Sequence, residues 1–468
     1  MKVITSLIIT VLVATSAAAE VKTLYMKHCS ACHLAERYGL TGPPLLPEYF
    51  GRKKEAEIKD IISNGLPATN MPAFKDTLKQ DEIAEIASFI SQPVESPHWG
   101  MDDMLGTLSV AESSGTADIK PQFDMTDFFM VVEGGAGKVH FMDGETFTLR
   151  GQVRVGAIHG GPKFSRDLKH SYIIGRDGWL VKYDIITFKE KARIRTAIST
   201  RNIAVSSDSR LVAQTNLLPN NIVIIDAETM KPLKIIEHKA RLGAVYNLRT
   251  KKKFVAGIQD ENAILLIDED TLETKTLKTD QPFTDFFIDN TERFLIGSSR
   301  DSERLSIIDI ETGGTVKTIK IASGMPHLAS AAIWSTDNKT FAAFPHIGKS
   351  LVTIMELYTW EIKAEVRIKG PGFFARTHDC LSHIWVDTGT DTIELINKQT
   401  FENEKTLVPE AGKKAMHIEF SKDGRNALIS VWEDDGAVKI YDTKTLELVK
   451  TLPFKKPVGK YNATNKRF

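Results

Sequence analysis

Cys29, Cys32 and His33 belong to the stretch of this sequence with the most specific chemistry, Cys-Ser-Ala-Cys-His. Two thiols at this spacing can add to the vinyl groups of a heme, and the histidine that follows can ligate its iron. The motif therefore predicts a covalently attached heme c rather than a disulfide. The third cysteine, Cys380, lies beside apolar Leu381, and we expect a buried structural thiol there.

The residues around this motif predict a small all-α domain over residues 20–97. Apolar side chains recur at helical spacing over 53–64 and 80–91, and a Gly-Pro-Pro-Leu turn at 42–45 follows the heme motif. Met71 lies between the two helices, in Asn-Met-Pro. This order of motifs resembles the class I cytochrome c domain, and the resemblance implies that Met71 is the second iron ligand. A His/Met pair suits electron transfer because it leaves no open position for a substrate.

Composition and the N-terminal sequence indicate the class of partner and the location of the protein. Lysine and arginine together number 60, as do aspartate and glutamate, so the chain lacks the basic excess that nucleic-acid-binding proteins carry. Residues 1–19 have the pattern of a secretory signal peptide, with Lys2 before an apolar run and three alanines before Glu20. No later stretch approaches the ~20 apolar residues of a transmembrane segment. We therefore expect a soluble protein of the periplasm.

Residues 123–468 contain an internal repeat that predicts the larger domain. Five apolar runs end in aspartate, at intervals of 41 or 42 residues, and three further runs follow. A period of about 40–45 residues with four strands is typical of a propeller blade. We expect an eight-bladed β-propeller, and hence an α + β multidomain protein. A strand near 449–452 is expected to close the ring by pairing with residues from 123–132.

Residues 98–122 join the two predicted domains. Serine, glycine, alanine and aspartate dominate 109–119, and this composition predicts a connector of limited order. Trp99 lies at its start, where it can pack against one domain or wedge between the two.

Three histidines precede the inner strands of different predicted blades: His159, His327 and His417. Corresponding loops of a propeller converge on its axis, so these side chains can meet at one mouth. Imidazole ligates iron and acts as a base near neutral pH, so the three together predict a site, whereas each alone would be structural. His346 lies in a turn that can face the same mouth. Cations also gather on this side, either as solvated charge or as partners of ligand carboxylates: Lys163, Arg176, Arg201 and Arg241.

A cytochrome c domain followed by an eight-bladed propeller resembles the cytochrome cd1 family over nearly the whole mature chain. Matching motifs include Ile-Gly-Arg-Asp-Gly (174–178), Met-Pro-His (325–327), Phe-Ser-Lys-Asp-Gly (420–424) and Pro-Val-Gly-Lys-Tyr-Asn (457–462). Two departures separate the chain from the nitrite reductases of this family. Lys163 stands where they carry the proximal histidine, and no histidine occurs near 283–284, where they carry a second distal one. The sequence instead resembles the branch of dihydro-heme d1 dehydrogenases.

This resemblance implies an oxidoreductase of heme d1 biosynthesis, which converts a propionate of dihydro-heme d1 to an acrylate and passes the electrons to heme c. It implies that His159 and His327 ligate the tetrapyrrole iron. His417 would act as the base, assisted by Tyr461. The cations expected to orient the substrate carboxylates are Lys163, Arg176 and Arg201.

The resemblance also implies partners for the protein. These are a soluble electron acceptor and, in transient contact, cytochrome cd1 nitrite reductase and other heme d1 maturation proteins. Two alternatives stay open at this point: a cd1-type nitrite reductase with an altered site, and a non-catalytic heme d1 carrier.

Overall fold

The computed structural model of the chain describes most of its residues: 19–50, 54–66, 71–94, 97–112, 121, 123–156, 158, 160–299, 302–322 and 324–467. Residues 1–18 of the predicted signal peptide lie outside this part of the chain, and so does His159. Within it, no helix is both long and apolar enough to cross a membrane.

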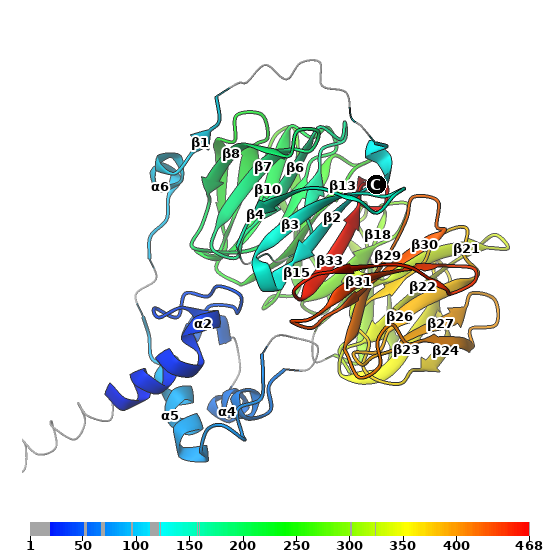
Figure 1. The fold of residues 1–468 in the computed structure, drawn as a ribbon. Coiled ribbons are helices and arrows are strands. Elements are labelled where there is room, and N and C mark those ends of the chain that lie inside the picture. The colour runs from blue at the N-terminus through cyan, green and yellow to red at the C-terminus, as the bar shows by residue number, and fades with distance from the viewer. Residues whose placement is uncertain are drawn as a thin grey trace, which may run out of the picture.

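The N-terminal domain consists of short helices around a small apolar core (blue in Figure 1). Residues 19–28 are helical, followed by α2 (Ser30–His33), α3 (Pro47–Phe50), α4 (Glu55–Asn64) and α5 (Gln80–Ile90). Helices α4 and α5 correspond to the two that the sequence predicts. In α5 the buried side chains are Ile83, Ile86, Ala87 and Ile90, at the spacing of one helix face. This face packs against Tyr25, Ile58 and Ile62.

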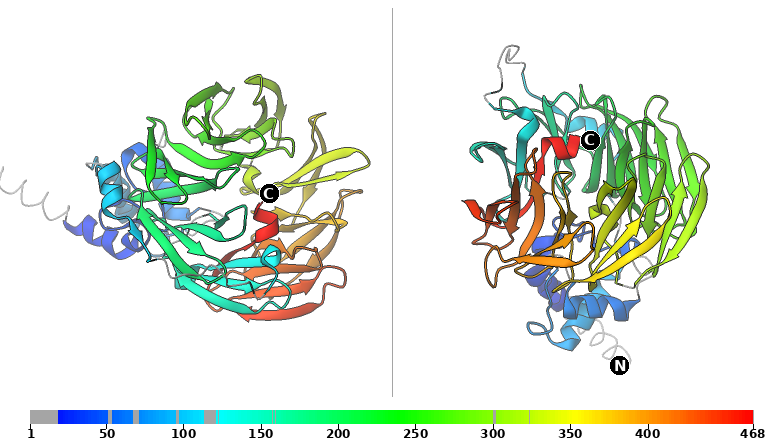
Figure 2. Two further views of the ribbon diagram at one scale, coloured as in Figure 1. Left: turned by 90° about the horizontal axis from the view of Figure 1, so that it is seen from above. Right: turned by 90° about the vertical axis from the view of Figure 1, so that its right-hand side faces the viewer.

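The rest of the described chain forms eight antiparallel sheets around a common axis, so the predicted eight-bladed propeller is confirmed (Figure 2). From the axis outward, blade 1 contains β33 (Pro457–Asn462), β2 (Phe128–Glu133), β3 (Lys138–Asp143) and β4 (Leu149–Arg154). Blade 2 contains β5 (Lys163–Phe164), β6 (His170–Ile174), β7 (Trp179–Asp184) and β8 (Lys189–Arg195). Blade 3 contains β9 (Ser199–Val205), β10 (Leu211–Leu218), β11 (Asn221–Asp226) and β12 (Pro232–Glu237). Blade 4 contains β13 (Leu242–Leu248), β14 (Lys253–Ile258), β15 (Ala263–Asp268) and β16 (Thr274–Lys278).

The second half of the ring repeats this order. Blade 5 contains β17 (Asp285–Ile288), β18 (Phe294–Ser298), β19 (Arg304–Asp309) and β20 (Gly314–Lys320). Blade 6 contains β21 (Ala332–Thr336), β22 (Lys339–His346), β23 (Lys349–Glu356) and β24 (Glu361–Arg367). Blade 7 contains β25 (Ala375–Arg376), β26 (His383–Asp387), β27 (Ile393–Asn397) and β28 (Asn403–Leu407). Blade 8 contains β29 (Ala415–Phe420), β30 (Asn426–Val431), β31 (Ala437–Asp442) and β32 (Leu448–Pro453).

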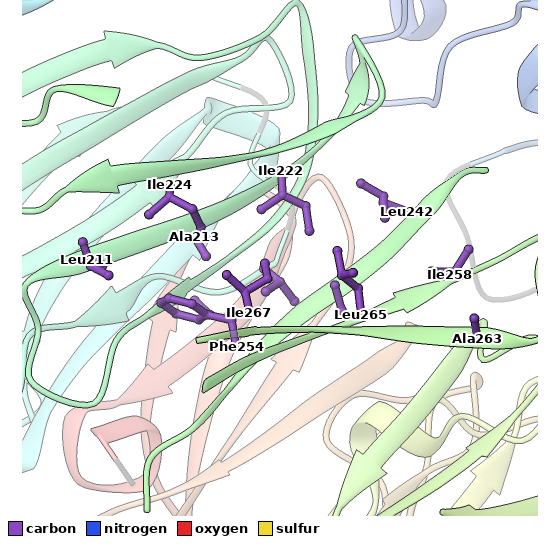
Figure 3. Close-up of a cluster of buried hydrophobic side chains, with 13 residues drawn as sticks. Leu211, Ala213, Ile222, Ile224, Leu242, Phe254, Ile258, Ala263, Leu265 and Ile267 are labelled. Carbon is purple, nitrogen blue, oxygen red and sulfur yellow. The ribbon is translucent and has the colours of Figure 1, made fainter. Parts of the chain in front are cut away.

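The aspartates that end the repeated runs shape the turn between the third and fourth strand of a blade. Asp184, Asp268 and Asp442 each accept backbone N–H groups from the residues two and three positions later. Such Asx turns supply hydrogen bonds that the chain loses when it leaves the sheet. Neighbouring blades then pack face to face through their apolar side chains. Figure 3 shows this core between blades 3 and 4, where Ala213 and Ile224 lie near Phe254 and Ile267.

The ring closes through β33 rather than through the strand that the sequence suggested. β33 pairs with β2, with Tyr461 opposite Met130, and becomes the innermost strand of blade 1. The expectation for residues 449–452 was wrong, because they belong to β32, the outer strand of blade 8. This closure brings residues from the end of the chain to the axis. A short helix, α7 (Ala463–Arg467), follows.

The first part of the connector is ordered, contrary to the expectation from its composition. Residues 97–112 include α6 (Met101–Gly106) and β1 (Ser109–Val110), and β1 pairs with β8 as a fifth strand of blade 2. Met104 is fully buried in the apolar core between blades 2 and 3. The Trp99 indole N–H donates to the Arg195 carbonyl at 3.1 Å, so this tryptophan packs against the propeller. Residues 113–120 and 122 lie outside the described chain.

Candidate functional site

The heme motif occupies one turn of helix, and its local geometry fits covalent heme c. Cys29 and Cys32 are three residues apart at α2, so both thiols lie on one helix face, and both are free cysteines. His33 is buried, and its Nδ1 donates to the Pro43 carbonyl at 2.8 Å. Burial lowers the pKa of His33, so the ring is neutral and Nε2 keeps the lone pair that a ligand needs. Gly42 is required beside it, because an added Cβ would lie 2.4 Å from Cε1 of His33.

Met71, the predicted second ligand, lies on the loop between α4 and α5. Its carbonyl accepts the Leu66 N–H at 3.2 Å, and its side chain is partly buried. Gly65 ends α4 in the left-handed region, and a Cβ there would lie 2.7 Å from the Met71 carbonyl oxygen. The sharp turn at Gly65 therefore determines where the Met71 loop starts. The role of Met71 as a ligand stays a prediction.

In the propeller, three of the predicted site residues lie along one row of ring contacts. His327 precedes β21 in blade 6, and its ring centroid lies 6.0 Å from that of Phe374. Phe374 lies 4.7 Å from His417 on β29, and His417 lies 5.2 Å from Tyr461 on β33. The fold thus brings together His327, His417 and Tyr461, from blades that are far apart in sequence.

His327 has the same hydrogen-bonding arrangement as the heme histidine. Its Nδ1 donates to the Phe373 carbonyl at 2.7 Å, and its Nε2 lies 4.0 Å from Asp285. Burial lowers the pKa of His327 despite the opposing charge of Asp285. A neutral ring with Nδ1 protonated presents the Nε2 lone pair, the form in which imidazole binds iron. Asp285 also accepts the backbone N–H groups of Leu328 and Ala329, at 3.0 Å each, and so holds the His327 loop from blade 5.

Two glycines border the side chain of Tyr461. An added Cβ at Gly161 would lie 2.2 Å from the Tyr461 ring, and one at Gly459 would lie 2.6 Å from its hydroxyl oxygen. Burial raises the pKa of Tyr461 to about 12, so the phenol stays neutral and can donate a hydrogen bond. Gly161 also places the inner edge of blade 2, which continues into Lys163, next to this tyrosine.

The predicted cations fall into different surroundings. Arg176 is buried and donates from Nη1 to the Thr200 carbonyl at 3.0 Å, while its Nε has no hydrogen-bond partner within the described chain. Burial, and then the neighbouring charge of Arg201, lower the pKa of Arg176 well below its usual range. Lys163 is partly buried on β5, and burial lowers its pKa. Arg241, by contrast, is already paired with Asp260, Nη2 to Oδ1 at 2.5 Å.

Electrostatic coupling shows that several of these groups share one region. Burial is the largest influence on the pKa of His327, and the charges of Arg376 and Arg201 lower it further. Arg376 also acts on the pKa of Tyr461, after burial. Arg201 acts likewise on Asp285, whose pKa burial raises. Arg376 of blade 7 also donates from Nη1 to the Ser330 carbonyl at 3.3 Å, so this arginine borders the His327 loop.

Sequence reasoning missed four residues of this region: Asp285, Arg376, Asp387 and Lys460. Lys460 lies within the Pro-Val-Gly-Lys-Tyr-Asn stretch (457–462), but no motif marks the other three, and each of the four acquires its role from a partner in another blade. His346 is fully buried and its Nε2 forms a hydrogen bond with Thr353 at 2.8 Å, next to the His327 loop. The expectation for Cys380 was wrong, since this thiol is exposed. It follows the turn at His378, where the chain leaves the inner strand of blade 7.

A helical domain with a heme c motif, joined to an eight-bladed propeller with buried imidazoles, defines a class of two-domain cytochromes. The chain belongs to the Cytochrome D1 heme domain family, which matches residues 123–466. Residues 16–90 match the family described as Cytochrome C oxidase, cbb3-type, subunit III. The resemblance to the cytochrome cd1 family is thereby confirmed.

Individual relatives cover most of the chain. The Dihydro-heme d1 dehydrogenase of Pseudomonas aeruginosa is 37% identical, over 95% of this chain and 94% of the relative. The Nitrite reductase of Stutzerimonas stutzeri is 23% identical, over 95% and 92%. A solved structure titled Dihydro-heme d1 dehydrogenase NirN in complex with DHE aligns with a TM-score of 0.80 and 36% identity, over 95% of this chain and 99% of that one.

Proposed function

We propose that this protein is an oxidoreductase of heme d1 biosynthesis, which dehydrogenates a propionate side chain of dihydro-heme d1 to an acrylate. The observation that carries the proposal is the row of His327, His417 and Tyr461 inside a propeller whose chain also bears a heme c motif. A relative that is 37% identical over nearly its full length carries the name of this activity.

The reaction converts the two methylene carbons of the propionate into a double bond. Two C–H bonds break, and two protons and two electrons leave the substrate. We assign removal of one proton to His417, because its ring is buried next to the neutral Tyr461 phenol, and the second proton passes to water. Tyr461 donates a hydrogen bond to the substrate. Cys29, Cys32 and His33 would hold heme c, which would supply a one-electron acceptor for each of the two electrons, with a soluble partner as their final acceptor.

Substrate binding is assigned to histidines that can ligate iron and to cations that can bind carboxylates. His327 offers Nε2 to the tetrapyrrole iron, and His159, which lies outside the described residues, remains the predicted ligand of the other face. Among the described residues, the buried Nε of Arg176 has no hydrogen-bond partner, and a substrate carboxylate can accept from it. Lys163 and Arg201 are proposed to act with it.

The location is inferred from the N-terminal sequence, and the partners are inferred from the function. We place the protein in the periplasm, because residues 1–19 have the pattern of a secretory signal peptide. There it would meet cytochrome cd1 nitrite reductase, which uses heme d1, and other heme d1 maturation proteins.

A conversion assay tests the proposal. Purified holo-protein is incubated with dihydro-heme d1 and an oxidised soluble acceptor, while absorbance and product mass are followed. We expect an extended macrocycle chromophore and the loss of two hydrogens. Binding without conversion would indicate a carrier, and turnover of nitrite would indicate a reductase.

Variants of two histidines test the assignment of the base. His417→Ala should bind the precursor but fail to oxidise it. The matched control is His383→Ala, whose ring pairs with Glu404 away from the site, and it should behave as wild type. Full-rate oxidation by His417→Ala would remove this residue from the mechanism.

A further inference from the structure

His417 has a backbone conformation that is unusual for a residue within a strand. Its φ is 53°, in the left-handed region, which costs free energy for a residue with a side chain. Among the described residues other than glycine with positive φ, His417 is the one that lies inside a strand. The pairing of β29 with β30 is interrupted there, between Met416 and Ile418, as in a β-bulge. Something in the surroundings must hold this conformation.

Asp387 holds the N–H side of His417. This carboxyl group is fully buried at the end of β26 and accepts the His417 N–H at 3.2 Å. It also accepts the N–H groups of Phe373 at 2.6 Å and Phe374 at 3.2 Å. Because the Phe373 carbonyl receives the Nδ1 proton of His327, one carboxyl group connects the supports of both histidines.

Lys460 holds the opposite side of the same residue. It is fully buried on β33, and its Nζ donates to the His417 carbonyl and to the Ser430 hydroxyl, the latter at 2.9 Å. Its backbone N–H points at Nδ1 of the His417 ring, at 3.5 Å. Both backbone polar groups of His417 are therefore bound by side chains from other strands. Burying a lysine and an aspartate costs free energy, which their hydrogen bonds to His417 offset in part.

We propose that Asp387 and Lys460 are positioning residues, which clamp His417 in its left-handed conformation and aim its imidazole past Tyr461 toward the substrate. The clamp deepens the proposed function, and it rests on His417 acting on dihydro-heme d1. It joins three parts of the ring: blade 7 through Asp387, blade 8 through His417 and the closing strand through Lys460.

The test uses full-length holo-protein with Asp387→Asn and Lys460→Met, both close to the native side chains in shape. We expect kcat to fall about 10²-fold, the effect of about 1 Å of misplacement, with KM and precursor binding nearly unchanged. In a His417→Ala background, neither substitution should lower the residual rate further. The controls Asp391→Asn and Lys369→Met break an exposed ion pair at blade 7, Nζ to Oδ1 at 2.9 Å, and should change nothing. Should Lys460→Met fail to fold, Ser430→Ala removes only the second partner of Lys460 and should give a smaller loss of kcat.

A structural measurement separates failure of the clamp from failure of the proposed function. Crystal structures of the two variants should show residue 417 relaxed to an extended conformation or its ring turned away, whether or not the wild type converts the precursor. A left-handed His417 with an unmoved ring in both variants would overturn the clamp. So would wild-type kcat, or equal losses of rate with and without His417.

Discussion

Gly161→Ala tests the site through a single added methyl group. Its Cβ would lie 2.2 Å from the Tyr461 ring, whereas carbon atoms in contact are ~3.5–4.0 Å apart. The ring must therefore retreat by about 1.3 Å or more. Gly161 has no left-handed φ, so the effect is steric and not conformational. Tyr461 has little room to retreat, because Gly459 and His417 border it on other sides.

The expected consequences are a modest loss of stability and a large loss of rate. Overpacking of this kind costs ~1–3 kcal/mol, which a lower Tm would report. A displacement of about 1 Å in a group that contacts the substrate lowers kcat by about 10²-fold. The assay is the conversion of dihydro-heme d1 with an oxidised acceptor, alongside thermal unfolding. Gly106→Ala is the matched control, because nothing lies within 4 Å of the Cβ that it adds.

A double substitution tests whether Gly161→Ala acts through the Tyr461 ring. Tyr461→Ala removes the ring that Gly161→Ala displaces, so the double variant should be no slower than Tyr461→Ala alone. Additive losses would show that Gly161 acts by another route. Wild-type kcat in Gly161→Ala, together with an inactive Tyr461→Ala, would contradict the close contact itself.

Three further predictions concern the heme motif, the clamp and the free thiol. Gly42→Ala should displace the His33 ring, since the new Cβ would lie 2.4 Å from Cε1, and should reduce the covalent heme content measured by absorbance and heme staining; full heme loading would contradict this. Burial raises the pKa of Asp387 from its ordinary 3.8 to about 6, so ionisation of this carboxyl group opposes folding. As the pH rises from about 4 to above 6, the free energy of unfolding should therefore fall by about 3 kcal/mol. In Asp387→Asn, the free energy of unfolding measured with denaturant should change less between pH 4 and pH 7 than in the wild type. An unchanged pH dependence would show that other groups cause it. Cys380 is exposed, so a maleimide should label one thiol in native holo-protein and none in Cys380→Ser; an unlabelled wild type would show that the thiol is covered.

Features carried by local sequence could be predicted before the structure. The heme motif is a contiguous stretch. The propeller can be predicted because most blades repeat the same turn chemistry, and in six of the eight blades the third strand ends in an aspartate. The helices of the N-terminal domain follow from apolar periodicity in the same way. These signals depend on interactions within a few residues, so they are readable without knowing what lies across the fold.

Only the tertiary structure decided how the ring closes and what supports the histidines. The closing strand is β33, which pairs with a strand more than three hundred residues earlier in the chain. The clamp on His417 depends on that closure, because Lys460 reaches the axis only through it. The connector pairs with β8 because an unpaired strand edge is available there, which its own composition does not show.

The histidines themselves illustrate this division. Their side chains are visible in the sequence, and so predict a site, but the expected place before an inner strand was wrong for His417, which lies within β29. The roles of these imidazoles depend on their hydrogen-bond partners. The Phe373 carbonyl binds Nδ1 of His327 and leaves Nε2 with a lone pair, and Asp387 and Lys460 hold the backbone of His417. Those partners come from other blades, because hydrogen bonds in a propeller's centre link strands that are close in space and distant in sequence. The residue types are therefore a property of the sequence, and their chemical roles are a property of the closed ring.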